Sequence, residues 1–444
     1  MKLEIPQKAN QIIQTLEQNG YEAYAVGGCV RNAVLGLPAH DWDICTNAKP
    51  EQLKQVFGDY TTHDFGLKHG TLVVSVDGEP FEVTTYRIDG DYADNRHPES
   101  VTFTDDLTAD LSRRDFTVNA IAYSDRRGFV DPFGGAQDIK SNLLRCVGDP
   151  DRRFNEDALR ILRGLRFASV YGFAIEPQTA RSIHQNAALL QNIAQERIRE
   201  ELTGMLCGKN VLKTADEFRD VIAVAIPELT ETFDFPQRSK HHQYDVWRHI
   251  LHSVAAIDSE PLLRMTMLLH DLGKPRACTT DEKGANHFKG HQQISADLAE
   301  VILKRLRFPN VFMQSCLQLI LYHDVRFDGT EKQVKHVLQA LGEEQMRLLF
   351  KVQRADLAAQ SDYRRLQKLA AVDAAERQTE KVLQQRQCFS LKQLAVNGVD
   401  LIALGIPEGR AVGAALQALL TAVMNNELPN EKTALLAKVK QDIL

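Results

Sequence analysis

Two patterns of apolar residues divide this chain. Residues 1 to about 150 contain short β-branched or aromatic runs broken by Gly, Asp and Pro, whereas helical spacing dominates from about 151 onward. Short strands are predicted at residues 71–76, 81–87, 100–104 and 128–133, and an amphipathic helix within residues 1–20. The pattern predicts the α+β class, with a mixed α/β head built on a small sheet and a long all-α part after it.

The length of 444 residues is too great for one ordinary core, so several domains are expected. Turn-rich or polar stretches near residues 148–154, 225–240 and 374–387 mark the boundaries. The predicted segments are a head at 1–150, a helical neck at 151–215, a helical body at 216–370 and a helical tail at 371–444.

Composition narrows the class of protein. The content of 43% apolar and 25% charged residues is typical of a soluble globular protein, and no apolar run approaches the roughly 20 residues that span a bilayer. The seven cysteines are scattered without a Cys-x-x-Cys pair, which favours reduced thiols and a cytoplasmic location. With a net charge of −6, any contact with nucleic acid has to come from local basic patches.

The stretch "YAVGGCVRN" predicts a short strand, a Gly27-Gly28 turn and a helix with Arg31 in its first turn. Adjacent glycines let a bound group approach the backbone closely, and helix-start N–H groups together with Arg31 can accept a phosphate. The motif is neither a dinucleotide fingerprint nor a Walker loop. Taken alone, it fits a purely structural turn as well as a phosphate site.

Asp41 and Asp43 flank Trp42 just downstream. In a strand these two carboxylates would face the same side, where they repel each other unless a cation lies between them. Mg²⁺ prefers such oxygen ligands and commonly links carboxylates to substrate phosphates. An isolated exposed Asp pair is the alternative. Together with the upstream glycines and arginine, the pair predicts a catalytic metal site of a nucleotidyltransferase.

Further arginines follow in two polar segments. Arg114, in "LSRRDF", is a candidate triphosphate ligand, with a helix cap or surface ion pair as the alternative. Residues 84–99 are rich in Gly, Asp and Arg, and predict a mobile loop that contains Arg87, Asp94 and Arg96.

Residues 154–168, "FNEDALRILRGLRFA", predict a helix with an apolar back and an Asp/Arg front. At about 100° per residue, the front carries Asp157, Arg160, Arg163 and Arg166. A solvated face with ion pairs is the alternative. An Asp acceptor beside an Arg donor complements the amino group and ring nitrogen of cytosine or adenine, so Asp157 and Arg160 could select CTP and ATP over UTP and GTP.

These motifs, with "HDWDI", "DPFGG" and "EDALRILRGLRFA", resemble the class II tRNA nucleotidyltransferases, the CCA-adding enzymes, over about the first 210 residues. The resemblance implies that Asp41 and Asp43 bind Mg²⁺ and that Gly28, Arg31 and Arg114 hold the triphosphate. It also implies that Asp157, Arg160, Arg163 and Arg166 contact the incoming nucleotide, and that the loop around residues 87–96 goes with adding the final A. The chain departs from the family at Asn32, where an acid usually follows the arginine.

A second set of residues lies in the predicted body. His270-Asp271 closes an apolar helix, with His249 on a helix upstream and Asp356 on one downstream. Two imidazoles and two carboxylates from separate helices suit a divalent metal site for phosphoester hydrolysis, and a buried hydrogen-bonded His-Asp couple is the alternative. The set, with His291 and His323 as extra candidates, resembles the HD phosphohydrolase superfamily, in which phosphatase or 2′,3′-cyclic phosphodiesterase activity is found.

The expected function is therefore template-independent addition of C, C and A to the 3′ end of tRNA from CTP and ATP, with release of pyrophosphate. Mg²⁺ is the expected cofactor, with a second divalent metal in the HD domain, and the tRNA acceptor end is the expected partner. Three rivals stay open: an A-only adding enzyme, a poly(A) polymerase, and an HD metal phosphohydrolase whose head only binds nucleotide or RNA.

Overall fold

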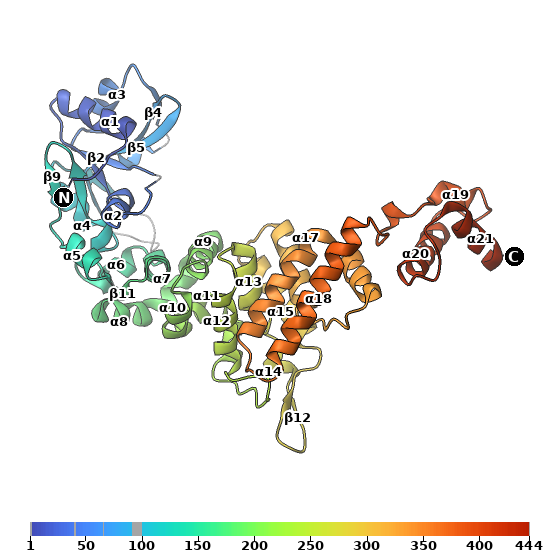
Figure 1. The fold of residues 1–444 in the computed structure, drawn as a ribbon. Coiled ribbons are helices and arrows are strands. Elements are labelled where there is room, and N and C mark those ends of the chain that lie inside the picture. The colour runs from blue at the N-terminus through green and yellow to red at the C-terminus, as the bar shows by residue number, and fades with distance from the viewer. Residues whose placement is uncertain (1, 40, 65, 91–99, 444) are drawn as a thin grey trace. The chain divides into compact units, whose positions relative to one another are not determined.

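The computed structural model describes residues 2–39, 41–64, 66–90 and 100–443. The chain forms two compact units, residues 1–227 and 228–444. Unit 1 carries the mixed sheet, and unit 2 is almost entirely helical (Figure 1). The predicted α+β class, with a mixed head and a long helical part, is confirmed. The finer division into four segments stays a prediction.

A seven-stranded mixed sheet forms the base of unit 1, in the order β3-β4-β5-β2-β1-β8-β9. β2 and β5 are parallel, and the other neighbours are antiparallel. The strands are β1 (Ala23–Val26), β2 (Ile44–Thr46), β3 (Thr61–His63), β4 (Thr71–Val76), β5 (Glu79–Thr85), β8 (Ala122–Ser124) and β9 (Gly128–Val130). In β4 every second residue is buried, which is the pattern of a strand with one face on the core.

Two short pairs complete the strands of unit 1: β6 (Arg87–Asp89) with β7 (Val101–Phe103), and β10 (Leu143–Leu144) with β11 (Ala174–Ile175). All four predicted strand segments contain a strand. The expectation of a loop from residue 84 is wrong at its start, because residues 87–89 pair with residues 101–103. Asp94 and Arg96 lie outside the described residues.

The helices of the first part of unit 1 are α1 (Gln7–Gln18), α2 (Gly28–Val34), α3 (Pro50–Val56), α4 (Leu107–Ser112) and α5 (Gly135–Lys140). The predicted N-terminal amphipathic helix is α1, which packs on β1 and β2. It buries Ala9, Ile12, Ile13 and Leu16, whose i, i+3, i+4, i+7 spacing places them on one side of the helix.

Six further helices continue unit 1: α6 (Pro150–Glu156), α7 (Leu159–Tyr171), α8 (Pro177–Asn186), α9 (Gln195–Leu206), α10 (Val211–Glu217) and α11 (Arg219–Ala225). The prediction of one continuous helix through residues 154–168 is wrong. Asp157 is extended, with φ −138° and ψ 102°, and separates α6 from α7. Its carboxylate accepts a hydrogen bond from the Leu159 N–H at 3.1 Å, so its side chain caps the start of α7.

Unit 2 contains the helices α12 (Val246–Ala256), α13 (Pro261–Leu269), α14 (Lys274–Ala277), α15 (His291–Arg305), α16 (Asn310–Tyr322), α17 (Glu331–Ala358) and α18 (Arg365–Gln384). A small hairpin, β12 (Thr279–Thr280) with β13 (Asn286–His287), interrupts them. α12 packs on α13 and α17 (Figure 1). α16 packs on α13, α15 and α17. The packing brings the ends of α12 and α13 and the C-terminal half of α17 to one place.

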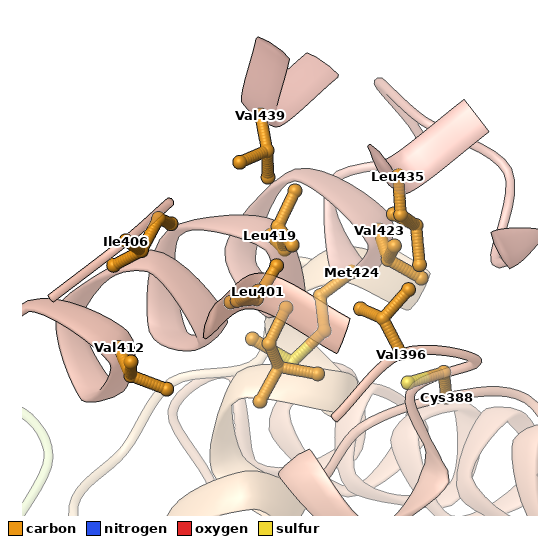
Figure 2. Packing of buried hydrophobic residues seen from close by; sticks show 11 residues of the cluster. Cys388, Val396, Leu401, Ile406, Val412, Leu419, Val423, Met424, Leu435 and Val439 are labelled. Atoms are coloured by element: carbon orange, nitrogen blue, oxygen red, sulfur yellow. The ribbon is translucent and has the colours of Figure 1, made fainter. Parts of the chain in front are cut away.

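The last three helices, α19 (Gly398–Ile402), α20 (Arg410–Met424) and α21 (Lys432–Ile443), have an apolar core of their own. Figure 2 shows this cluster, in which Leu419 and Met424 of α20 lie with Leu401 of α19 and Leu435 of α21. No helix in the described part of the chain combines the length and the apolar character that a membrane span requires.

Candidate functional site

A cleft of about 520 Å³ in unit 1 gathers the metal-binding and nucleotide-binding residues predicted in the head and neck, while Arg87 does not line it. Its walls include Gly28, Arg31, Asp41, Asp43, Arg114, Asp157, Arg160, Arg163 and Arg166. The structure therefore brings the predicted phosphate, metal and base residues to one cavity, although they come from four separate stretches of sequence.

The two acids lie immediately before β2 rather than within it, so the strand expected at Asp41–Asp43 begins one residue later, at Ile44. The Val26 N–H donates to the Asp43 carbonyl at 3.0 Å, which extends the pairing of β1 by one step. Trp42 is only 6% exposed, while Asp41 and Asp43 are open to the cleft. Both carboxylates thus lie on the side opposite Trp42.

The environment of Asp43 fits a bound cation. Partial burial, the Glu82 carboxylate and, more weakly, Asp41 raise the pKa of Asp43 to about 6, against the lowering effect of Arg114. A carboxyl group that is hard to ionise beside other acids is stabilised in its charged form by a divalent ion. Glu82, on β5, is a third acid of this region that the sequence reading missed.

Gly27, rather than Gly28, is the glycine that the cleft requires. Its φ of +83° lies in the left-handed region, and a Cβ atom there would stand 2.9 Å from Nη1 of Arg114. At Gly28 a Cβ would meet nothing closer than 3.6 Å. The missing side chain at Gly27 therefore makes room for the guanidinium of Arg114.

Arg31 is buried and held by neutral groups. Its Nε and Nη2 donate to Oδ1 of Asn32 at 3.2 and 3.0 Å, Nη2 also donates to the Tyr171 hydroxyl at 2.7 Å, and Nη1 donates to Oδ1 of Asn119. The guanidinium lies 4.5 Å from the centre of the Tyr171 ring. The Asn32 amide thus orients Arg31 from the position at which the resemblance led us to expect an acid.

Asp115 is the buried anion of the cleft. It accepts hydrogen bonds from Nδ2 of Asn119 and Nε of Arg163, both at 2.9 Å. Burial alone raises the pKa of Asp115, but the Arg163 charge, the Asn119 hydrogen bond and the Arg160 charge lower it to about 2. Asp115 and Asn119 were not among the predicted site residues. The position of Asp115 directly after Arg113-Arg114 was the one feature of the sequence that could have indicated it.

Asp157 and Arg160 both line the cleft, and the Arg160 N–H donates to the Asp157 carbonyl at 3.0 Å, but their side chains bond to other groups. Nη1 of Arg160 donates to Glu156 at 2.9 Å and to the Arg153 carbonyl at 3.2 Å, and Nη2 donates to the Arg113 carbonyl at 3.0 Å. Arg160 therefore links the start of α7 to the segment after α4. Its pairing with Asp157 for reading a base stays a prediction.

The two remaining arginines of α7 share a partner on α9. Nε of Arg166 lies 2.5 Å from one oxygen of Glu201, and Nη1 of Arg163 lies 3.6 Å from the other. Their guanidinium groups lie 4.6 and 5.3 Å from the centre of the Phe167 ring. Ion pairs and ring contacts therefore fix both side chains along the cleft wall.

Comparison with known proteins decides the family. The CCA-adding enzyme of Levilactobacillus brevis is 35% identical to this chain over 446 residues, an alignment that covers 97% of this chain and 96% of the relative. The chain belongs to the CCA-adding enzyme family. The predicted resemblance to class II tRNA nucleotidyltransferases is thereby confirmed.

Other matches agree with this membership. The CCA-adding enzyme of Limosilactobacillus reuteri is 33% identical over 434 residues, with coverage of 98% and 96%. That of Geobacillus thermodenitrificans is 41% identical over 266 residues, which cover 58% of this chain and 65% of the relative. The crystal structure of the Bacillus stearothermophilus CCA-adding enzyme in complex with CTP matches with a TM-score of 0.72 and 30% identity, over 99% of this chain and 98% of the other.

Family models match three stretches of the chain. Residues 23–145 match the poly A polymerase head domain, which surrounds the paired acids. Residues 172–231 match the model described as a probable RNA and SrmB-binding site of polymerase A. Residues 290–439 match tRNA nucleotidyltransferase domain 2.

In this member of the CCA-adding family, unit 2 holds a second cluster of ionisable side chains. Nε2 of His249 lies 3.1 Å from Oδ2 of Asp271 and 2.9 Å from Oδ1 of Asp356, and Nε2 of His270 lies 3.2 Å from Oδ2 of Asp271. The side chains of His249, His270 and Asp271 are at most 1% exposed. The four residues predicted from separate helices are therefore brought together.

His291 and His323 join the cluster on the other side of Asp271. Their Nε2 atoms lie 3.2 and 3.7 Å from Oδ1 of Asp271, whereas His249 and His270 approach Oδ2. Two groups of side chains with the geometry of metal ligands thus share the Asp271 carboxylate. A bridging carboxylate with imidazole ligands on both sides can hold two divalent ions.

The orientation of the histidines fits metal binding. Nδ1 of His270, His291 and His323 lies 2.7, 2.8 and 2.6 Å from a backbone carbonyl in each case, so Nδ1–H donates there and Nε2 faces the cluster. The Nε2 atoms of His291 and His323 lie 3.2 Å from each other.

Nε2 of His249 and Nε2 of His270 contact the carboxylates of Asp271 and Asp356 at 2.9 to 3.2 Å, and Nζ of Lys274 lies 2.6 Å from Oδ2 of Asp271. The same nitrogen and oxygen atoms are ligands that a divalent cation accepts.

Replacing Asp115 by Asn should destabilise unit 1 in a pH-dependent way. Because the folded-state pKa of about 2 lies below the ordinary 3.8, the carboxylate stabilises the fold above about pH 4, and this contribution disappears as the pH falls towards 2. A shift of this size corresponds to roughly 2 kcal/mol. The measurement is urea unfolding by fluorescence in a Trp247→Phe background, so that Trp42 reports on unit 1 alone.

The matched control is Asp59→Asn, at an exposed position of the same unit. Its unfolding free energy should follow that of the parent at every pH. An Asp115→Asn loss of the same size at pH 7 and pH 2.5 would contradict the assignment of Asp115 as the buried anion.

Replacing Asp271 by Asn should disrupt both metal-ligand sets at once, because each set uses one of its oxygens. We expect two Mn²⁺ ions per chain in an Asp41→Asn, Asp43→Asn background, with an exchange-coupled electron paramagnetic resonance spectrum. Asp271→Asn should abolish the coupling and weaken binding at least ~10-fold. The control, Asp324→Asn, changes a half-buried acid outside the two sets. A coupled spectrum that survives Asp271→Asn contradicts the shared carboxylate.

Proposed function

We propose that the chain adds C, C and A to the 3′ end of tRNA without a nucleic-acid template, using CTP and ATP and releasing pyrophosphate. The observation that carries this proposal is the unit 1 cleft, in which paired acids face phosphate-binding arginines within a CCA-adding family chain. Related solved structures are described as complexes with CTP, with ATP and with tRNA. A cytoplasmic location is part of the proposal.

The chemistry needs a divalent metal ion, and we propose Mg²⁺ held by Asp41 and Asp43. When bound, the ion polarises the reacting oxygens and neutralises phosphate charge. The terminal ribose hydroxyl of the tRNA attacks the α-phosphorus of the nucleotide, and the bond to pyrophosphate breaks. Arg31 and Arg114 bind the phosphates that become the leaving group, and their positive charges stabilise it as it departs.

In this proposal, Asp157 and Arg160 at the start of α7 select the base of the incoming nucleotide. Arg160 has five N–H donors, and its hydrogen bonds to Glu156, Arg153 and Arg113 use three of them. Two donors remain for a ring nitrogen of cytosine or adenine. Within the described part of the chain, Nη2 of Arg197 donates to Oδ2 of Asp157 at the long distance of 3.5 Å, so Oδ2 can also accept from the amino group of the same base. Uracil and guanine present the reverse pattern and would leave both groups unpaired.

One assay separates the three candidate polymerase activities, which are CCA addition, A-only addition and poly(A) synthesis. Purified chain is incubated with CTP, ATP or both, on tRNAs that end before the first C or after the second C. The proposal predicts C, C and A on the first tRNA and a single A on the second. Addition only to the second tRNA would indicate an A-only enzyme, and homopolymer tails on unrelated RNA would indicate a poly(A) polymerase.

Changing Asp41 and Asp43 together to Ala should reduce nucleotide addition by at least ~10³-fold, because the proposed metal ligands are lost. The fold should persist, since both side chains are exposed to the cleft. Addition is measured by gel extension of tRNA, and any phosphoester hydrolysis in unit 2 should be unchanged. Residual addition near the parental rate would contradict the metal assignment.

A second function, metal-dependent phosphoester hydrolysis, is favoured by the cluster around Asp271 in unit 2. The convergence of four imidazoles and two carboxylates supports it, because these are ligand types of divalent-metal hydrolases. The resemblance to the HD superfamily remains a prediction. Hydrolysis of p-nitrophenyl phosphate that requires added Mn²⁺ and is lost in Asp271→Asn is the test.

A further inference from the structure

Two aromatic side chains of α7, Phe167 and Tyr171, contact the arginines of the unit 1 cleft. They are four residues apart and therefore share one side of the helix, and their ring centres lie 6.0 Å apart. Phe167 lines the cleft but is only 3% exposed, so it is too buried to stack on a nucleotide base. Tyr171 is half-buried and is not part of the cleft wall. We name the pair the aromatic ledge.

Three arginines of the cleft lie over the aromatic ledge. The guanidinium of Arg31 lies 5.0 Å from the centre of the Phe167 ring and 4.5 Å from that of the Tyr171 ring. Arg163 and Arg166 lie over Phe167, at 5.3 and 4.6 Å. The negative face of an aromatic ring attracts a cation without carrying a net charge. The ledge can therefore hold these arginines without cancelling the charge that a phosphate would bind.

The arginines need such a support because they repel one another. Burial lowers the pKa of Arg31, and the charge of Arg166 lowers it further. Glu201 pairs with both Arg163 and Arg166, whereas among the described residues no carboxylate lies within ion-pair distance of Arg31. A carboxylate beside Arg31 would also hold it in place, but would compete with the phosphates for its charge.

The Tyr171 hydroxyl adds a second, directional contact. It accepts a hydrogen bond from Nη2 of Arg31 at 2.7 Å and donates one to Oδ1 of Asn32 at 3.2 Å. The same Oδ1 accepts from Nε and Nη2 of Arg31. The three side chains thus close a ring of hydrogen bonds that contains no carboxylate. Through this ring, the last residue of α7 fixes an arginine of α2.

We propose that Phe167 and Tyr171 are positioning residues for the triphosphate of the incoming nucleotide. The aromatic ledge places Arg31, Arg163 and Arg166 for the phosphates without adding negative charge, and both aromatic residues act through these arginines rather than by touching the nucleotide. The proposal rests on the nucleotide addition proposed for unit 1. It implies that the ledge affects every ligand that carries a di- or triphosphate, whatever its base.

The test measures binding in the absence of tRNA, so that no nucleotide is consumed. Calorimetry in Mg²⁺ gives the Kd of the full chain for CTP, ATP and pyrophosphate, which has no base. Tyr171→Leu removes both the ring and the hydroxyl, and should raise all three Kd values by the same factor, at least ~10-fold. Tyr171→Phe keeps the ring and should raise them ~3-fold.

Tyr123→Phe is the matched control. It also removes a single hydroxyl from unit 1, one that donates to Asp125 at 3.2 Å, and Tyr123 does not line the cleft. All three Kd values should stay at those of the parent.

Asn32→Asp separates the position of Arg31 from its charge. The acid can still accept from Arg31 and from the Tyr171 hydroxyl, but it adds a negative charge beside the guanidinium. The Kd for pyrophosphate should therefore rise at least ~3-fold, and it should depend less steeply on salt concentration. An unchanged or lower Kd in this variant contradicts the view that uncancelled charge is what the ledge preserves.

The outcomes separate this role from its alternatives. Unchanged Kd values in Tyr171→Leu overturn the proposal. Weaker CTP binding with unaltered pyrophosphate binding also overturns it, because the ring would then act on the base or ribose. An equal loss in Tyr123→Phe overturns it too, since that indicates a general loosening of unit 1. If Tyr171→Leu does not fold, Tyr171→Phe and Asn32→Asp decide the question.

Failure of the proposed function has a different signature. If the parent chain binds CTP and pyrophosphate but does not extend tRNA, nucleotide addition falls and the role of the ledge in phosphate binding stands. If the parent binds neither ligand, both proposals fall.

Discussion

The hydrogen-bonded ion pair between Asp115 and Arg163 is the interaction on which the unit 1 cleft depends. Through Asn119, the same carboxylate is also connected to Arg31. The phosphate side and the base side of the cleft are therefore fixed to one buried anion. Asp115 carries one negative charge and is linked to two arginines, Arg163 directly and Arg31 through Asn119. The other partners of Arg31 are neutral, so positive charge remains to bind a triphosphate.

The cluster of unit 2 is buried, whereas the site of unit 1 is open. Four imidazoles point their Nε2 atoms at the carboxylates of Asp271 and Asp356, and Nζ of Lys274 lies 2.6 Å from Oδ2 of Asp271. In unit 1 the protein satisfies its buried charge and leaves cations and acids exposed at the surface of the cleft. The ligand proposal for unit 2 therefore rests on the convergence of metal-ligating side chains, whereas that for unit 1 rests on the shape and charge of an open cavity.

Local sequence signals were sufficient for much of the fold. β-branched runs such as residues 71–76 form strands because alternate residues face the core, and the apolar spacing of residues 7–18 forms α1. The paired acids could be read from their i, i+2 spacing, which survives although the residues precede β2. His249, His270, Asp271 and Asp356 could be grouped because helix ends carry them, yet their shared use of Asp271 could not be read from the chain.

Some features of the cleft depend on contacts between distant segments and could not be predicted from local sequence. The break at Asp157 is invisible to a helical periodicity, because it depends on an aspartate side chain competing for the Leu159 N–H. Asp115 and Asn119 gain their importance only from burial against α7, and Arg160 is drawn to carbonyls of Arg113 and Arg153 that lie elsewhere in the sequence. The need for glycine at position 27 likewise depends on the left-handed backbone there, with φ +83°.

The most direct test is a crystal structure of the full chain with CTP and Ca²⁺, an ion that allows binding with little turnover. The account predicts Ca²⁺ between the carboxylates of Asp41 and Asp43 and the triphosphate beside Arg31 and Arg114, with Asp115 still bonded to Asn119 and Arg163. A nucleotide bound outside this cleft, or an Asp115 that leaves both partners to admit it, would contradict the account.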